Sequence, residues 1–336
     1  MANNSPRMRI ELGIVMVAAS LTSTVDSAAE YHPEIFARGV ISIPGEDRTI
    51  TFTPDMRTAY FVRRSPATLT SPISAIVESH WASGRWSVPV VASFSGKYPD
   101  SDPFVTRDGK WMFFTSARPA TGAGKDRYHV WMVAWTPTGW SEPENVTALN
   151  SPGNDAFPTV AANGALYFWS DRPPTECGSL YRSEFRDGKY QQPEKLRAPL
   201  NSDKWPSIQP FIGPNEDYMV FVMVGRPDER LAVGSPAYTR GDLYVSFRAK
   251  GGMWRDPIHL PPPINTAYAE GNPGVSPDGA WLFFTSERCF VPELHDRRYT
   301  YQELVAGHSG TYDCTGNIYR VPMKVIDDFR RSVEDK

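Results

Sequence analysis

Carboxylate and arginine side chains recur along this sequence at two regular positions. These residue types can form ion pairs, bind a ligand or catalyse hydrolysis. The acidic set is Asp47, Asp100, Asp155 and Glu270, with Ser207 at the fourth of five places. The second set is arginine throughout: Arg64, Arg118, Arg172, Arg226 and Arg288. An arginine paired with a carboxylate forms a strong, geometrically specific bond. Two carboxylates without such a partner, about 5–10 Å apart, could instead hydrolyse a glycosidic bond.

The repetition therefore supports two interpretations. In the structural one, each carboxylate pairs with an arginine of its own or the next repeat. In the functional one, the acids and arginines surround a funnel that binds sugars, peptides or a protein segment. If the protein is an enzyme, the candidate catalytic acids are Asp100, Asp155 and Glu270. Asp102 lies outside the register of the repeat, so it is less easily assigned to structure.

The two sets belong to an internal repeat that predicts β-strands. Its turn residues are Asp55, Asp108, Asn163, Glu216 and Asp278, spaced 53, 55, 53 and 62 residues apart. Asp-Gly and Asn-Gly supply the positive φ of hairpin turns, and the flanking β-branched and aromatic runs are typical of strands. A third strand follows in each copy, at 73–77, 130–134, 180–183, 243–246 and 318–321. Four copies continue into an aromatic-x-x-Pro segment, at 86–89, 140–143, 190–193 and 254–257, which we predict to be the fourth, outer strand.

Four antiparallel strands per repeat make a propeller blade. Five copies of the first three strands are followed by only four outer segments. The missing one lies at the other end of the chain, because Pro33–Ala37 resembles Pro193–Arg197. We predict an all-β, five-bladed β-propeller of four-stranded antiparallel blades, in which the N-terminal strand closes the last blade. Six blades are the alternative.

This topology brings the loops before the first strand to the same face as those between the second and third strands. The acids and arginines should meet there, beside a long loop after Arg288 that carries Arg297 and Tyr299. The predicted binding residues are Asp47, Asp100, Asp102, Asp155, Glu270, Arg64, Arg118, Arg172, Arg226, Arg288, Arg297 and Tyr299. Long loops on a rigid scaffold commonly carry specificity.

The phrases Val275–Ser286 and Gly241–Ser246 resemble the WD40-like (PD40) repeats of TolB-type β-propellers, and the likeness extends from about residue 31 to 323. The resemblance implies the propeller fold. It leaves the function open, because such propellers serve as scaffolds, as binding modules and occasionally as enzymes.

The N-terminus has the layout of an export signal. Arg7 and Arg9 precede an apolar run that is too short to span a membrane, and Ser27-Ala28-Ala29 fits a cleavage site. We predict a signal peptide over 1–29, the propeller over 30–324 and a C-terminal helix or tail over 325–336; an unstructured N-terminal tail is the alternative. Cys289 and Cys314 could form a disulfide in an oxidising compartment, and unpaired thiols are the alternative.

Composition and motifs bound the function. A formal charge of −3 excludes a basic nucleic-acid binder. No CxxC pair, P-loop, Rossmann glycine pattern or G-x-S-x-G elbow is present, so we expect no cofactor and no metal. We predict a periplasmic or secreted monomer that binds a partner protein or an envelope glycan. The alternative is a carbohydrate-active hydrolase or lyase.

Overall fold

The computed structural model describes residues 31–65, 73–120, 127–174, 177–226, 241–288, 300 and 315–334. The predicted signal peptide, Arg297, Tyr299 and the predicted cysteine pair Cys289 and Cys314 lie outside these residues.

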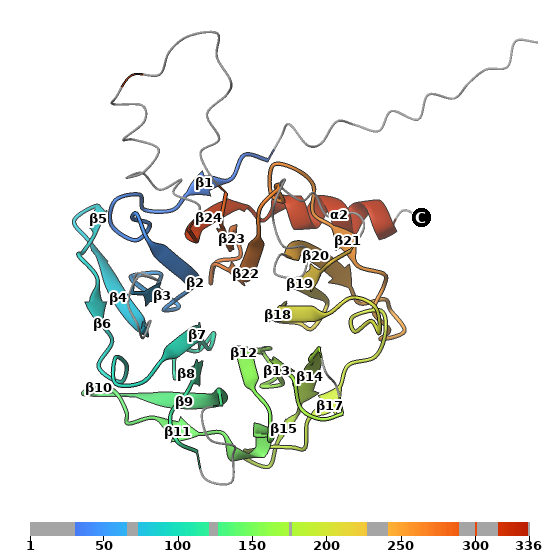
Figure 1. Ribbon diagram of the computed structural model, residues 1–336, viewed down its shortest axis with the longest axis horizontal. Helices are drawn as coiled ribbons and strands as arrows, with labels where there is room; N and C mark the ends of the chain where they lie inside the picture. The colour runs from blue at the N-terminus through green and yellow to red at the C-terminus, as the bar shows by residue number, and fades with distance from the viewer. Residues whose placement is uncertain are drawn as a thin grey trace, which may run out of the picture.

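The described chain forms five antiparallel blades around a central axis (Figure 1), so the predicted five-bladed propeller is confirmed. The innermost strands, in order from blade 1 to blade 5, are β2 (Glu46–Phe52), β7 (Asp100–Val105), β12 (Asp155–Val160), β18 (Ser207–Ile212) and β22 (Glu270–Val275). The second strands are β3 (Thr58–Arg64), β8 (Trp111–Ser116), β13 (Leu166–Ser170), β19 (Tyr218–Val224) and β23 (Trp281–Ser286). The third strands are β4 (Ser74–Ala82), β9 (His129–Thr136), β14 (Ser179–Ser183), β20 (Gly241–Phe247) and β24 (Asn317–Pro322).

The outer strands of blades 1 to 4 lie later in the sequence than predicted, whereas that of blade 5 lies within the predicted segment 33–37. They are β6 (Val90–Val91), β11 (Glu144–Asn145), β17 (Glu194–Lys195), β21 (Ile258–His259) and β1 (Glu34–Ile35). Those of blades 1 to 4 follow the proline of the aromatic-x-x-Pro segment instead of containing it. The reason is that proline cannot donate a ladder hydrogen bond and so precedes the paired residues.

The aromatic part of that segment folds as a side hairpin in blades 1 to 3. Its strands are β5 (Arg85–Trp86), β10 (Gly139–Trp140), and the pair β15 (Phe185–Arg186) and β16 (Lys189–Tyr190). The hairpin aromatic packs on the preceding blade: Trp140 donates from Nε1 to the Tyr60 hydroxyl at 2.9 Å, and the Tyr190 ring lies 5.9 Å from that of Phe113. These side chains therefore fasten each blade to its predecessor.

The two ends of the chain close the ring, as predicted. Strand β1 pairs with β24 in antiparallel register, with Glu34 opposite Arg320 and Ile35 opposite Tyr319. The Phe36 N–H continues the ladder to the Ile318 carbonyl at 2.9 Å. Closure pairs an edge of blade 5 that would otherwise be exposed.

The buried side chains form five clusters, and each lies between two neighbouring blades. Phe36, Phe52 and Phe283, for example, meet at the joint of blades 5 and 1. Tyr60 and Phe114 belong to the next joint, and Phe113 and Phe168 to the one after it. The remaining clusters join blade 3 to blade 4 and blade 4 to blade 5. A blade thus buries its faces only against its neighbours.

Helix α2 (Lys324–Glu334) follows β24 and takes the place that a side hairpin has in blades 1 to 3. Val325 and Ile326 are buried in the cluster between blades 4 and 5. Arg330 lies over the Tyr218 ring and forms an ion pair with Asp217 at 2.6 Å. None of the helices in the described ranges has the length and hydropathy needed to cross a bilayer.

Replacing Phe36 by alanine should lower the free energy of unfolding by about 3–5 kcal/mol, because the cavity would open inside the closing joint. The Phe36 ring makes edge contacts with Phe283, Phe52 and Trp86 at centroid distances of 5.0, 5.8 and 5.9 Å. Urea unfolding measures the change. Val88→Ala is the control: its side chain is 83% exposed and should change stability by less than about 0.5 kcal/mol. Equal stability of the two variants would contradict closure through β1.

Candidate functional site

Four carboxylates stand at the beginning of innermost strands, and we call them the rim acids: Asp47, Asp100, Asp155 and Glu270. All four are buried, with at most 2% of their surface exposed. In three blades the residue directly opposite on the second strand is serine, and the predicted arginine follows that serine by two positions. Asp100 faces Ser116, Asp155 faces Ser170 and Glu270 faces Ser286.

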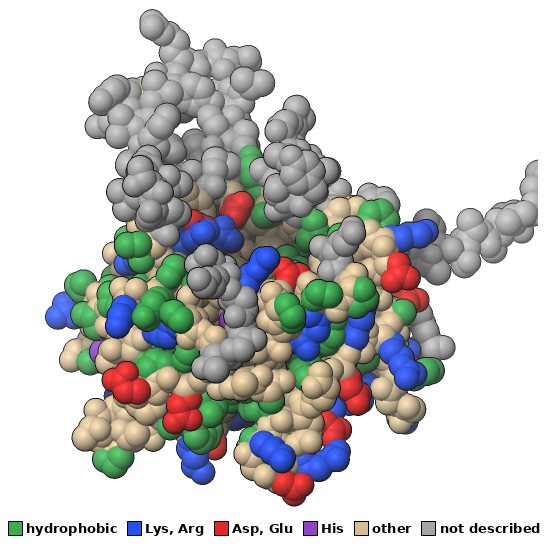
Figure 2. Space-filling view, turned by 60° about the horizontal axis from the view of Figure 1, so that its bottom comes forward, with side chains coloured by type: hydrophobic (Ala, Val, Ile, Leu, Met, Phe, Trp, Pro, Cys, Tyr) green, Lys and Arg blue, Asp and Glu red, His purple; other side chains and the backbone are tan. Residues whose placement is uncertain are grey.

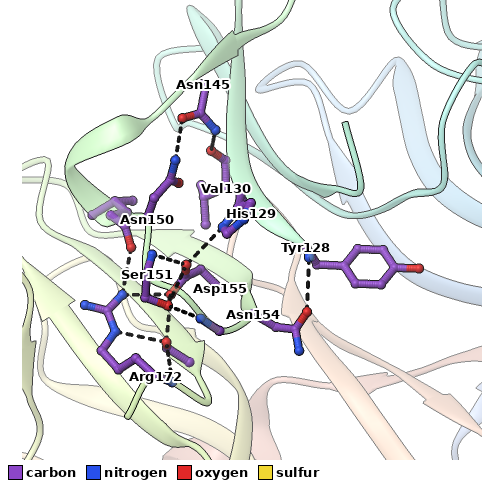
Figure 3. Close-up of polar contacts among 12 residues, drawn as sticks. Tyr128, His129, Val130, Asn145, Asn150, Ser151, Asn154, Asp155 and Arg172 are labelled. Atoms are coloured by element: carbon purple, nitrogen blue, oxygen red, sulfur yellow. Dashed lines mark hydrogen bonds and ion pairs between the residues drawn. The ribbon is translucent and has the colours of Figure 1, made fainter. Parts of the chain in front are cut away.

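Asp155 in blade 3 shows the most complete set of contacts (Figure 3). Arg172 donates from Nη2 to Asp155 Oδ1 at 2.7 Å, and the Ser170 hydroxyl donates to the same oxygen at 2.7 Å. The Ser151 N–H donates to Oδ2 at 2.8 Å. His129 Nδ1, from the third strand of blade 2, lies 3.1 Å from Oδ2. This carboxylate therefore holds residues of two blades and of the connection between them.

Blades 2 and 5 repeat this arrangement. Asp100 Oδ1 lies 3.0 Å from Arg118 Nη1. Glu270 Oε1 accepts from the Ser286 hydroxyl at 2.6 Å and lies 3.6 Å from Arg288 Nη2. The serine was not among the predicted site residues, although a Ser-x-Arg sequence ends the second strand in all three repeats.

Blades 1 and 4 depart from the predicted pairing. Asp47 is bound by Arg63 at 2.7 Å, whereas Arg64 pairs with Glu46 at 2.9 Å. Arg63 stands directly opposite Asp47, and because successive side chains of a strand point to opposite faces, the Arg64 side chain lies on the other face of the sheet. In blade 4, Ser207 replaces the acid, and Arg226 lies over the Tyr244 ring at 4.9 Å.

Each arginine of these pairs also holds the connection that enters its blade. Arg63, Arg172 and Arg288 donate to the carbonyls of Ile41, Leu149 and Ile264 at 2.8, 2.7 and 2.9 Å. Arg118 does the same to Phe94. The rim acids are thus paired with arginines within their own blades, as the structural interpretation expects.

Burial shifts the titration of two rim acids. Desolvation raises the pKa of Asp100 above its ordinary value against the opposing effects of Ser116, Ser95 and Arg118. Desolvation likewise raises the pKa of Glu270, to about 7, although Arg288 and Ser286 favour the charged form. The raised pKa values reflect the poor solvation of these two carboxylates, which is an energetic cost of burying them.

A second set of five residues, two positions after the rim acids and Ser207, interrupts every innermost strand. We call it the bulge ring. It consists of Thr49, Asp102, Phe157, Gln209 and Asn272, all with φ between 41° and 58°. The pairing register shifts at each of them. Proline follows four of the five, and this proline is the signal in the sequence from which the bulge could have been predicted.

The bulge ring lines a cavity of about 280 Å³ in the central channel. The walls come from the prolines after the bulges and from aliphatic, aromatic and threonine residues of the innermost strands, and Arg107 lines the cavity as well. Pro54, Pro214 and Pro277 from the first hairpin turns also line it, together with Met323 and with Asp327 of α2. The cavity therefore extends from the bulges toward the turns and α2. No rim acid and no arginine of the predicted set lines it.

Asp102 is the predicted binding residue that the cavity does contain. Its side chain accepts from the Ser101 hydroxyl at 2.8 Å and from Thr49 Oγ1 at 3.5 Å. It is 7% exposed, and burial raises its pKa above the ordinary value. In the described ranges, no ion pair engages Asp102, unlike the rim acids.

Arg226 contributes to a separate groove of about 840 Å³ between blades 3 and 4. Lys195, Arg197 and Lys204 line it as well, beside Trp205. Elsewhere, basic and acidic side chains are interspersed over the face in Figure 2, without one dominant sign.

No family model matches the chain, and no curated protein matches it. Among solved structures, it is similar to an α-L-arabinofuranosidase from Lactobacillus brevis, with a TM-score of 0.51 and 13% identity over 88% of this chain and 93% of that one. It is also similar to a structure described as a glycoside hydrolase, with a TM-score of 0.50 and 12% identity over 87% and 92% of the two chains. A puromycin-hydrolysing peptidase of Mycobacterium tuberculosis matches 71% of this chain with a TM-score of 0.39 and 12% identity, and the chain spans only 34% of that protein. The first two likenesses establish the propeller fold; the resemblance to TolB-type repeats stays a proposal.

Replacing Arg172 by methionine should lower the free energy of unfolding by about 3 kcal/mol, because the buried Asp155 carboxylate would lose its charged partner. Thermal and urea unfolding measure the loss. The control Arg64→Met removes a pair whose arginine side chain is 42% exposed, so its cost should stay below about 1 kcal/mol. If the free energy of unfolding fell by less than about 1 kcal/mol in both variants, the Arg172–Asp155 pair would not be important for stability.

Glu270 should make stability depend on pH between about 4.5 and 7. Its pKa in the folded chain, about 7, is above its ordinary value of 4.5, so the folded state binds the proton more tightly. The contribution of this group is therefore favourable at low pH and is lost as pH rises through 7. The stability of the wild type relative to Glu270→Gln should fall across this window in denaturant titrations. A constant difference from pH 4.5 to 7.5 would contradict the raised pKa.

Proposed function

We propose that this chain is an exported propeller of the TolB-type, PD40-repeat kind, which binds a glycan in its central channel and does not cleave it. The observation that carries the proposal is the division of polar groups along the innermost strands. At the strand starts, every rim acid is bound by an arginine of its own blade. Two positions further on, the bulge ring presents a carboxyl, two amides and a hydroxyl to a cavity that is lined largely by prolines, aliphatic residues and aromatic residues.

A concave apolar site with a few convergent polar groups is the usual form of a small-ligand site. The fixed backbone of five packed blades favours binding, because the polar groups are already in place before the ligand arrives. Location in the channel replaces our sequence-based expectation of a site among the rim acids. A site that includes Arg297 and Tyr299 stays a prediction.

Glycoside hydrolysis is the second candidate. The likeness in fold to the arabinofuranosidase and the glycoside hydrolase favours it, as does the buried Asp102, whose raised pKa suits a proton donor. The reaction needs a second carboxylate about 5–10 Å away. Asp327 of α2 is the other acid that lines the cavity, at the end formed by the turns. Asp100, Asp155 and Glu270, our sequence-based candidates, are bound by arginines instead.

Binding and hydrolysis can be separated with one panel of polysaccharides and labelled oligosaccharides. We expect the full chain to retain at least one glycan on an array and to release no sugar from it. Asp102→Asn keeps the size of the side chain and should weaken retention about tenfold, because an amide N–H replaces a carboxyl oxygen that accepts from the glycan. Glu194→Gln, on the exposed outer strand of blade 3, is the matched control and should change nothing.

Two results would overturn this proposal. Sugar release that Asp102→Asn abolishes, with folding intact by circular dichroism, would establish the hydrolase. Retention that survives Asp102→Asn but is lost in a folded Asp100→Asn variant would return the site to the rim acids.

A further inference from the structure

The bulge ring brings together four polar side chains and one aromatic side chain from strands that are far apart in the sequence. Thr49, Asp102, Gln209 and Asn272 belong to four different blades, and Phe157 belongs to the fifth. Amide and hydroxyl groups both donate and accept hydrogen bonds. Neighbouring hydroxyls of a sugar do the same, and the apolar face of a sugar ring fits an aromatic side chain such as Phe157.

The protein holds the side chain of Gln209 in position, and the amide groups of Gln209 and Asn272 can still form hydrogen bonds. The Asn272 N–H donates to Gln209 Oε1 at 2.7 Å, which fixes the Gln209 side chain across β22. Gly271 makes this possible, since a Cβ there would lie 2.4 Å from Gln209 Oε1. In the described part of the chain, no hydrogen bond uses Gln209 Nε2 or the Asn272 side-chain amide. Both therefore remain for a ligand.

The charge of the cavity end selects among ligand classes. An anion would be repelled by an ionised Asp102, whose oxygens accept from the hydroxyls of Ser101 and Thr49. A cation would pair with the Asp102 carboxylate but would leave the amide N–H donors of Gln209 and Asn272 without an acceptor. A neutral ligand with hydroxyl groups can satisfy the carboxyl as a donor and the amides as an acceptor.

The size of the cavity limits the length of the ligand. About 280 Å³ is just below the range of roughly 300–1,000 Å³ usual for drug-sized ligands. Prolines, aliphatic residues and aromatic residues make up most of the walls around the bulge ring. The hydroxyls of Thr51 and Thr159 in these walls already accept from the N–H groups of Val105 and Ile212, and Arg107 belongs to a hairpin turn at the other end. The polar contacts thus suit one ring at the inner end, with any continuation directed toward the turns and α2.

We propose that the bulge ring binds one neutral sugar ring, the terminal residue of a glycan, which enters from the side of the hairpin turns and α2. Asp102, Gln209 and Asn272 hold its hydroxyl groups, and Phe157 packs on its apolar face. This assignment rests on the proposed function and names its ligand class.

Saturation-transfer NMR and titration test the assignment with D-glucose, D-galactose, L-arabinose and D-xylose, and with butylamine and butyrate as charged probes. We expect the full chain to bind at least one neutral sugar and neither charged probe. Asn272→Gly, which tolerates the positive φ, should weaken that sugar about tenfold. Phe157→Leu should weaken it about fivefold. Gln192→Ala, which removes an exposed amide on blade 3, is the matched control and should leave affinity unchanged.

Three results would overturn the assignment, and they are distinguishable. Binding of butylamine with no sugar bound would make the ligand class wrong. Sugar binding that neither Asn272→Gly nor Phe157→Leu weakens would place the sugar elsewhere and leave the glycan-binding function intact. Failure of the wild type to bind any monosaccharide or any arrayed glycan would reject the proposed function together with this assignment.

Discussion

The pairing of β1 with β24 is the constraint on which the rest of this structure depends. Each blade buries its two faces only against its neighbours, so an open ring would expose the apolar faces of blades 1 and 5 together with an unpaired strand edge. Phe36, at the end of the closing strand, fills the joint between these blades. Arg320 of β24 adds a contact with Glu34 of β1 at 3.3 Å. The stability of the whole molecule therefore depends on contacts between residues almost 300 positions apart in the sequence.

Closure also determines what the channel can present. Five innermost strands are held at one level, so a bulge at the same place in each brings five side chains to one plane. A single blade could not form such a site, because each contributes one side chain. The positive φ of Asp102 or Phe157 is costly for a residue other than glycine, and surrounding contacts must hold it. The Phe157 N–H, for instance, donates to Thr115 of the preceding blade at 3.1 Å.

The sequence predicted the fold better than the site, and the reasons are physical. The repeat of turn residues and the missing outer strand are one-dimensional signals, so blade number and closure could be derived from them. Strand register was harder to predict, because a shift of one residue moves a side chain to the other face of the sheet. For this reason the arginine that reaches Asp47 is Arg63 and not Arg64. The aromatic segment was misassigned because its pattern resembles a strand, while Pro89 and its counterparts mark the point before pairing begins. The bulges were missed because non-glycine residues there give no composition signal apart from the proline that follows.

The two polar levels of the innermost strands have opposite electrostatic consequences. At the rim acids, charge is neutralised within the protein: arginine, serine and backbone groups occupy the carboxylate oxygens, and burial penalises any ligand that would have to displace them. At the bulge ring, the polar groups are held by few internal bonds, and only Asp102 is ionisable. A charged ligand would gain little at the first level, and at the second it would leave either Asp102 or the amide donors without a suitable partner. The strands that fasten the blades at one end therefore leave, at their bulges, a site suited to neutral hydroxyl groups.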